Sequence, residues 1–214
     1  MTIDGATIRD AEPRDLDAIA DIYSILWCNT LRNRGDLEDA ALAARFNIAM
    51  QFQRSPIAVV AEADGIIIAA CLVGIFDDGV PRSNPAWQAC YESLLTQATE
   101  RAETADAKLE GSLFGDSREK ATADRFAATG NEYAQAQINL IIIRPEWQGK
   151  GLGRTLIEQA RAEMRERGCT RFFLMTDNQS DYEFYDHIGM ERVAENHDQD
   201  TGDGFVVYIY GGTA

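Results

Sequence analysis

Residues 138–160, INLIIIRPEWQGKGLGRTLIEQA, decide the fold of this chain. The apolar run Leu140–Ile143 predicts a buried strand, and Pro145 ends it because proline has no backbone donor for a strand ladder. A glycine-rich turn, residues 148–153, follows, and apolar residues then recur at helical spacing, which predicts a helix from Leu152. Free backbone N–H groups and the positive end of the helix dipole converge at such a turn. We therefore predict that this turn binds a phosphate-bearing ligand.

The glycine spacing excludes two common nucleotide-binding loops. A Walker loop needs Lys-Ser/Thr after its last glycine, but Arg154 follows Gly153, and the glycines also lack the spacing of a dinucleotide fingerprint. The pattern Gln148-x-x-Gly151-x-Gly153, placed after a strand and an Arg-Pro-Glu turn, resembles the pyrophosphate loop of the GNAT N-acetyltransferases, Arg/Gln-x-x-Gly-x-Gly/Ala.

A second motif follows the predicted strand Arg171–Met175. Residues 178–190, NQSDYEFYDHIGM, resemble the second GNAT signature, Asn-x-x-Ala-x-x-Phe-Tyr-x-x-x-Gly-Phe. Four positions match in register: Asn178, Phe184, Tyr185 and Gly189. Met190 replaces the usual phenylalanine, and Asp181 stands where a small residue is common. With both motifs present, the chain is identified as a member of the GNAT family.

The resemblance implies an α/β fold with a mixed, mostly antiparallel central sheet. Its middle strands splay apart and helices flank it, as in the acyl-CoA N-acyltransferase fold. The order of elements ahead of the motifs agrees with this, because a strand, two helices and a hairpin are predicted there. We expect one GNAT domain over residues 1–214, with a helical insertion at about residues 77–130.

The expected insertion has no family motif. Helix-forming residues predict one helix over about 85–107, and Gly111 and Gly115 are expected to end it before a second helix over about 117–128. Two interpretations stay open: an embellishment packed on the main body, or a lid over the acceptor pocket.

The resemblance also implies where acetyl-CoA binds and how it reacts. The donor would lie in the gap between strands 133–143 and 171–175, with a backbone N–H near Ile141 polarising the thioester carbonyl. Tyr185 would act as the general acid that protonates the thiolate leaving group. The residues expected to bind the cofactor are Ile141, Ile142, Ile143, Gln148, Gly149, Lys150, Gly151, Leu152, Gly153, Arg154, Asn178 and Tyr185.

We expect the acceptor to be a primary amine of a small molecule or peptide that attacks the thioester directly. The polar face at the start of the central strand suggests a cleft, and the apolar stripe of the first helix ends near it at Trp27. We therefore expect Trp27, Gln135 and Gln137 to bind the acceptor. No carboxylate stands on that strand, so Glu132, Tyr133 and an ordered water chain remain candidates for the general base. The missing carboxylate also motivates an alternative, a non-catalytic acyl-CoA sensor or interaction module on the same fold.

Composition limits the partners. A formal net charge of −15 over 214 residues disfavours nucleic acid and anionic membranes, and would attract cationic amines. The four cysteines show no paired spacing and only two histidines occur, so we expect reduced thiols and no metal site. No long apolar run or signal sequence is apparent, and we expect a cytoplasmic protein. A homodimer is allowed, and the oligomeric state stays open.

Overall fold

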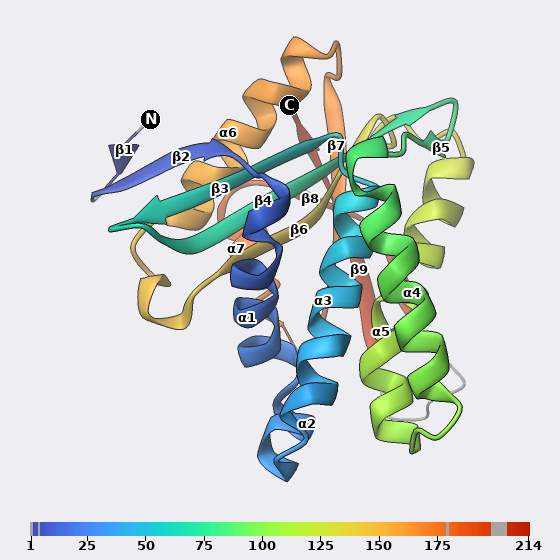
Figure 1. Cartoon of the computed structure of the whole chain (residues 1–214). Helices are drawn as coiled ribbons and strands as arrows, with labels where there is room; N and C mark the ends of the chain where they lie inside the picture. The colour runs from blue at the N-terminus through green and yellow to red at the C-terminus, as the bar shows by residue number, and fades with distance from the viewer. Residues whose placement is uncertain (1, 4, 179, 198–204) are drawn as a thin grey trace.

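The computed structural model describes residues 2, 3, 5–178, 180–197 and 205–214 (Figure 1). Its strands form one sheet in the order β1-β2-β3-β4-β6-β7-β9-β8, with β5 paired to β4. The strands are β1 (Thr2–Ile3), β2 (Ala6–Asp10), β3 (Ile57–Ala63), β4 (Ile66–Asp77), β5 (Val80–Pro81), β6 (Ala136–Ile143), β7 (Arg171–Asp177), β8 (Glu191–His197) and β9 (Val206–Thr213). Within the described chain only β6 and β7 pair in parallel. The predicted mixed, mostly antiparallel sheet is confirmed.

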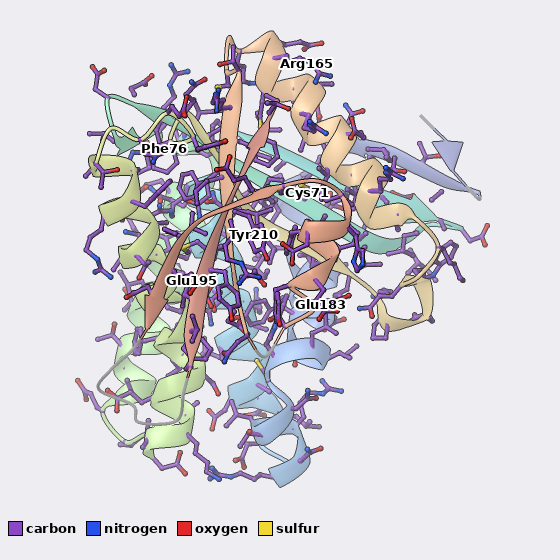
Figure 2. All side chains as sticks on the ribbon, turned by 180° about the vertical axis from the view of Figure 1, so that it is seen from behind. Cys71, Phe76, Arg165, Glu183, Glu195 and Tyr210 are labelled. Atoms are coloured by element: carbon purple, nitrogen blue, oxygen red, sulfur yellow. The ribbon has the colours of Figure 1, made fainter. Side chains whose placement is uncertain are left out.

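Helices cover both faces of this sheet. They are α1 (Leu16–Trp27), α2 (Asn29–Arg34), α3 (Leu37–Gln53), α4 (Gln88–Ala102), α5 (Ala107–Ala128), α6 (Leu152–Glu166) and α7 (Glu183–His187). One apolar cluster joins α1, α3, α4 and α5 to Leu72 and Leu140, and another joins α6 to the adjacent Cys71 and to Ile138. Neighbouring strand residues thus enter different cores, as side chains alternate across a strand. Seen from behind, α6 with Arg165 and α7 with Glu183 lie on the near side of the sheet (Figure 2).

The middle strands separate soon after they meet. β6 and β7 pair only at Gln137–Phe173 and Ile138–Leu174, and no further rungs join them. Our expected start of β6 at Tyr133 was too early. Asn131 accepts a hydrogen bond from the Tyr133 N–H through its side chain (3.0 Å), which folds this segment into a turn ahead of the strand. The predicted splay is present.

The predicted position of the break between the two helices of the insertion was wrong, because α4 ends at Ala102 and α5 already begins at Ala107. Gly111 and Gly115 lie inside α5, a continuous helix of 22 residues. Each glycine weakens a helix by about 1 kcal/mol relative to alanine. Burial of Leu109 and Leu113 beside these glycines opposes that loss, and Asp106 caps the first turn by accepting from two backbone N–H groups. Local propensity is here overridden by packing.

Side-chain pairs fasten α5 to the rest of the protein. The buried guanidinium of Arg54, just after α3, makes two hydrogen bonds to the Asp124 carboxylate at 2.6 and 3.2 Å. Asn47 of α3 donates to the backbone carbonyl of Ser112 (3.0 Å). These bonds hold α5 beside α3, as Figure 1 shows.

Candidate active site

A cavity of about 1120 Å³ lies where β6 and β7 separate. Its walls come from the later part of both strands, the glycine turn, the start of α6, α7, the end of α1 and one face of α5. Segments that are far apart in sequence therefore share one space. We describe it as a donor end, formed by β6 and the glycine turn, and an acceptor end, formed by α1, α5 and β7.

The glycine turn is shaped to bind an anion. Gly149 and Gly151 have φ values of 72° and 81°, a left-handed conformation that side-chain-bearing residues rarely adopt. The backbone N–H groups of residues 149–154 donate to no described residue, and α6 begins at Leu152 without a side-chain cap. Unpaired amides at a helix N-terminus favour negative charge. Arg154 lines the cavity beside them and adds a cation.

Two of the predicted loop residues orient the turn through contacts within it. The Gln148 side chain donates to the carbonyl of Ile143 (3.1 Å), and Lys150 lies over the Trp147 ring, 4.6 Å from its centroid. Gly153 permits a close approach, because a Cβ there would lie 3.3 Å from Cδ1 of Ile143. Lys150 is not in the cavity wall, whereas the other predicted residues of this loop are.

The edge of β6 that faces the cavity carries free backbone groups. The Arg144 N–H donates to Ile68 on β4 (2.8 Å), and the direction of these groups alternates along a strand. Ile142 therefore faces β4, while Ile141 and Ile143 direct their N–H and carbonyl groups toward the separating β7. The Ile141 N–H and carbonyl can thus pair with an extended ligand.

Tyr185 enters the same cavity from α7. Burial, the first cause, and then the electrostatic influence of Cys71 and Asp181 raise the pKa of its phenol to about 12. The hydroxyl hydrogen-bonds to no described residue, so it can donate to a ligand. Its ring packs 5.5 Å from that of Tyr210, centroid to centroid. Tyr210 holds α7 in place by donating to Asp186 (2.9 Å); Figure 2 shows Tyr210 on the sheet beside α7.

The acceptor end is acidic. Asp116 and Glu119 line it from α5, and Asp177 and Asp181 line it from the end of β7 and the loop that follows. Tyr23 of α1 donates to Oδ1 of Asp116 (2.8 Å). Burial raises the pKa of Asp116 despite this hydrogen bond.

Glu119 has an unusual carboxyl group. Its pKa is raised to about 7, first by burial and then by repulsion from Asp116 and Asp177. The side chain is nevertheless reached by solvent, because the cavity that surrounds it is open. It is crowded by protein yet accessible to a small ligand. Sequence reasoning missed both of the α5 carboxylates that line the cavity, Asp116 and Glu119. The spacing of Gly111, Gly115 and Glu119, four residues apart on one helical face, was a signal that could have drawn attention to them.

Of the predicted acceptor residues, only Trp27 lines the cavity. Gln135 accepts from the backbone N–H groups of Thr170 (2.8 Å) and Arg171 (3.3 Å), and it lines a second cavity of about 550 Å³. Gln137 is buried in the sheet, and its side-chain oxygen accepts no hydrogen bond from a described residue. The structure does not bring Gln135 or Gln137 to the acceptor end. The polar alternation that suggested them belongs to a turn and to a buried strand start.

Three further predicted residues lie away from the cavity wall. Asn178 accepts the Val206 N–H through its side-chain oxygen (3.1 Å), which ties the end of β7 to β9. Glu132 pairs with Arg171 (3.3 Å). Tyr133 donates to Glu191 (2.7 Å). Glu132 and Tyr133, the two candidate bases at the start of the central strand, therefore do not line the cavity.

Within the described part of the chain, no group of three or more His, Cys, Asp or Glu side chains could hold a metal ion. None of the described helices is both long enough and apolar enough to cross a bilayer.

Comparison with known proteins agrees with this geometry. Solved structures with the same fold include SsHAT (21% identity, TM-score 0.60, covering 98% of each chain) and the ribosomal-protein-S18-alanine N-acetyltransferase of Escherichia coli (14%, TM-score 0.55, covering 97% of this chain and 93% of that one). Another is yncA of Salmonella typhimurium with its cofactor acetyl-CoA (16%, TM-score 0.53, covering 98% and 94%). A search of curated proteins found no match. The acetyltransferase (GNAT) family model matches residues 19–190. The chain therefore belongs to the acetyltransferase (GNAT) family, whose members are acetyl-CoA-dependent N-acetyltransferases.

Proposed function

We propose that this protein transfers the acetyl group of acetyl-CoA to a primary amine of a small molecule or peptide by direct attack. One observation carries the proposal: a single cavity joins an anion-binding turn, a free strand edge and an acidic acceptor end. We take residues 1–214 as one GNAT domain in which residues 77–130 are an insertion that supplies part of the acceptor end.

The donor end fits acetyl-CoA. The unpaired amides of residues 149–154 would hold its pyrophosphate, and Arg154 would add charge. The Ile141 backbone would pair with the pantetheine arm and polarise the thioester carbonyl, which stabilises the oxyanion that forms during attack. Asn178 would act indirectly, by fixing the end of β7 against β9.

Tyr185 suits the role of general acid. Because its pKa is about 12, the phenol keeps its proton throughout the physiological range and can give it to the departing thiolate. The carboxylic groups at the acceptor end favour a cationic partner, and most primary amines are protonated in neutral water. The exposed ring of Trp27 offers a surface on which the apolar part of such an amine can pack.

The alternative of a non-catalytic acyl-CoA sensor was motivated by the lack of a strand carboxylate. The cavity does contain carboxylates, although they come from α5 and β7. This observation favours the enzyme.

A panel of primary amines, assayed for coenzyme A release from acetyl-CoA, tests the proposal. We expect turnover with at least one cationic amine and a matching acetylated product by mass spectrometry. Tight acetyl-CoA binding without thiol release across small amines, polyamines and peptide amines would instead support the sensor.

A further inference from the structure

We propose that Glu119 of α5 is the general base that takes a proton from the acceptor ammonium group before attack. The inference rests on the proposed function, and it places a catalytic residue in the helical segment that has no family motif.

The face of α5 around Glu119 is built to admit a substrate. Gly111 and Gly115 precede Glu119 at intervals of four residues, so the three lie on one side of the helix. All three line the cavity, and a Cβ added at either glycine would meet nothing within 4 Å. The two glycines therefore leave open space on the face of α5 that carries Glu119, between the side chains of Lys108 and Ser112, which also line the cavity.

Two carboxylates of α5 line the cavity, Asp116 and Glu119, and Glu119 is the one free to accept a proton. Asp116 already accepts from Tyr23 of α1 (2.8 Å) and from Gln51 of α3 (3.5 Å). Glu119 makes no hydrogen bond or ion pair with a described residue. On the opposite wall Asp177 of β7 accepts from Ser180 (3.1 Å). The occupied carboxylates fit a supporting role beside Glu119.

The surroundings of Glu119 also suit proton transfer near neutral pH. Burial and the two neighbouring carboxylates, Asp116 on its own helix and Asp177 on β7, raise its pKa to about 7. A base is most effective when its pKa lies near the working pH. Glu119 is therefore protonated and inactive below about pH 7, and ionised and active above it.

Proton transfers precede and follow the attack on the thioester. Glu119 takes one proton from the ammonium group, and the neutral amine forms a C–N bond with the thioester carbonyl carbon. The C–S bond then breaks as the carbonyl reforms, and Tyr185 gives its proton to the thiolate. A second amine proton, lost from nitrogen as the amide forms, restores Tyr185 through solvent, and Glu119 releases its proton to bulk water.

The direct test is Glu119→Gln, with Glu110→Gln as a matched control. Glu110 is an exposed carboxylate on the same helix that does not line the cavity. We expect Glu119→Gln to lower kcat by about 100-fold or more and to remove the rise in rate near pH 7, while acetyl-CoA affinity is unchanged. Glu110→Gln should keep the wild-type kcat and the rise in rate near pH 7. A Glu119→Gln profile that still rises near pH 7 with wild-type kcat overturns the proposal.

Thermal unfolding measured as a function of pH shows whether Glu119→Gln is folded. It also tests the raised pKa of the Glu119 carboxyl group independently of activity. The pKa of Glu119 is raised from 4.5 in an exposed reference state, so ionisation opposes folding. Glu119→Gln and wild type should unfold at similar temperatures below about pH 4.5. The variant should become relatively more stable between pH 4.5 and 7, and the difference should stay constant above pH 7. A difference that does not change with pH contradicts the proposed environment.

The two proposals fail in distinguishable ways. If wild type releases no coenzyme A with any amine, the proposed function fails. A second outcome is that wild type is active and that Asp116→Asn, rather than Glu119→Gln, removes the rise in rate near pH 7. Asp116 is then the base, and only the present inference fails. We expect Asp116→Asn instead to shift the rise in rate to lower pH, because loss of a negative neighbour lowers the pKa of Glu119.

Discussion

The two ends of the cavity present different chemical groups to a ligand. The donor end is formed by one continuous stretch, residues 138–154, and offers backbone N–H groups fixed by left-handed glycines. The acceptor end draws on α1, α5 and β7, and presents carboxylates whose ionisation depends on their neighbours. Backbone amides do not titrate between pH 5 and 9. Above about pH 7, where the phosphate groups of acetyl-CoA are fully ionised, donor binding should therefore be nearly independent of pH. The reaction rate should instead vary with the ionisation of the carboxylates at the acceptor end.

Tyr185 lies where the two ends meet, and its removal should have the largest effect. Tyr185→Phe keeps the ring but deletes the proton donor, so we expect kcat to fall by about 100-fold or more. Steady-state kinetics measure kcat, and calorimetry measures the affinity for acetyl-CoA. Tyr182→Phe is the control, because Tyr182 does not line the cavity. If acetyl-CoA affinity falls as much as kcat in Tyr185→Phe, then Tyr185 belongs to the donor end alone.

A change in the glycine turn should affect only the donor end. Gly151→Ala forces a side-chain-bearing residue into the left-handed region, at a cost of about 1–2 kcal/mol, and distorts the amides before α6. We expect acetyl-CoA to bind about 10-fold more weakly, as measured by calorimetry.

Gly35→Ala is the matched control for this variant. Gly35 has a φ of 84° at the end of α2, away from the cavity wall. It should lose similar stability and keep its acetyl-CoA affinity. Equal losses of affinity in both variants would show that the amide turn has no special role.

The smallest effect is expected from substitution of Gly115, which tests the acceptor end of the cavity alone. Gly115→Ala places a methyl group in open space on a helix, and should stabilise the protein by about 0.5–1 kcal/mol. For a chain of this size the melting temperature should rise by about 2 °C, measured by calorimetric scanning.

A larger residue at the same position tests whether this face admits the amine. Gly115→Leu should raise KM for the amine while the Kd of acetyl-CoA stays unchanged. An unchanged KM in Gly115→Leu would mean that the acceptor does not lie along α5.

The donor end could be predicted from sequence because its signals are local. The hairpin at Asp64–Gly65, where both residues have positive φ, and the helix from Leu152 were also predicted, since each depends on a few adjacent residues. The acceptor end could not be predicted from sequence, because it depends on contacts between distant segments. The continuity of α5 depends on burial of Leu109 and Leu113 against other helices. The raised pKa of Glu119 depends partly on Asp177, 58 positions later in the chain.

Arg54 contacts elements from both ends of the cavity. Its guanidinium holds Asp124 of α5, and its backbone carbonyl accepts from the Asn139 side chain (3.3 Å), which lines the cavity from β6. One residue thus connects α5, which carries Glu119, to β6, where we propose that the thioester binds. Substitutions on the cavity face of α5 would then change the acceptor end while the contacts of Arg54 with α5 and β6 stay in place.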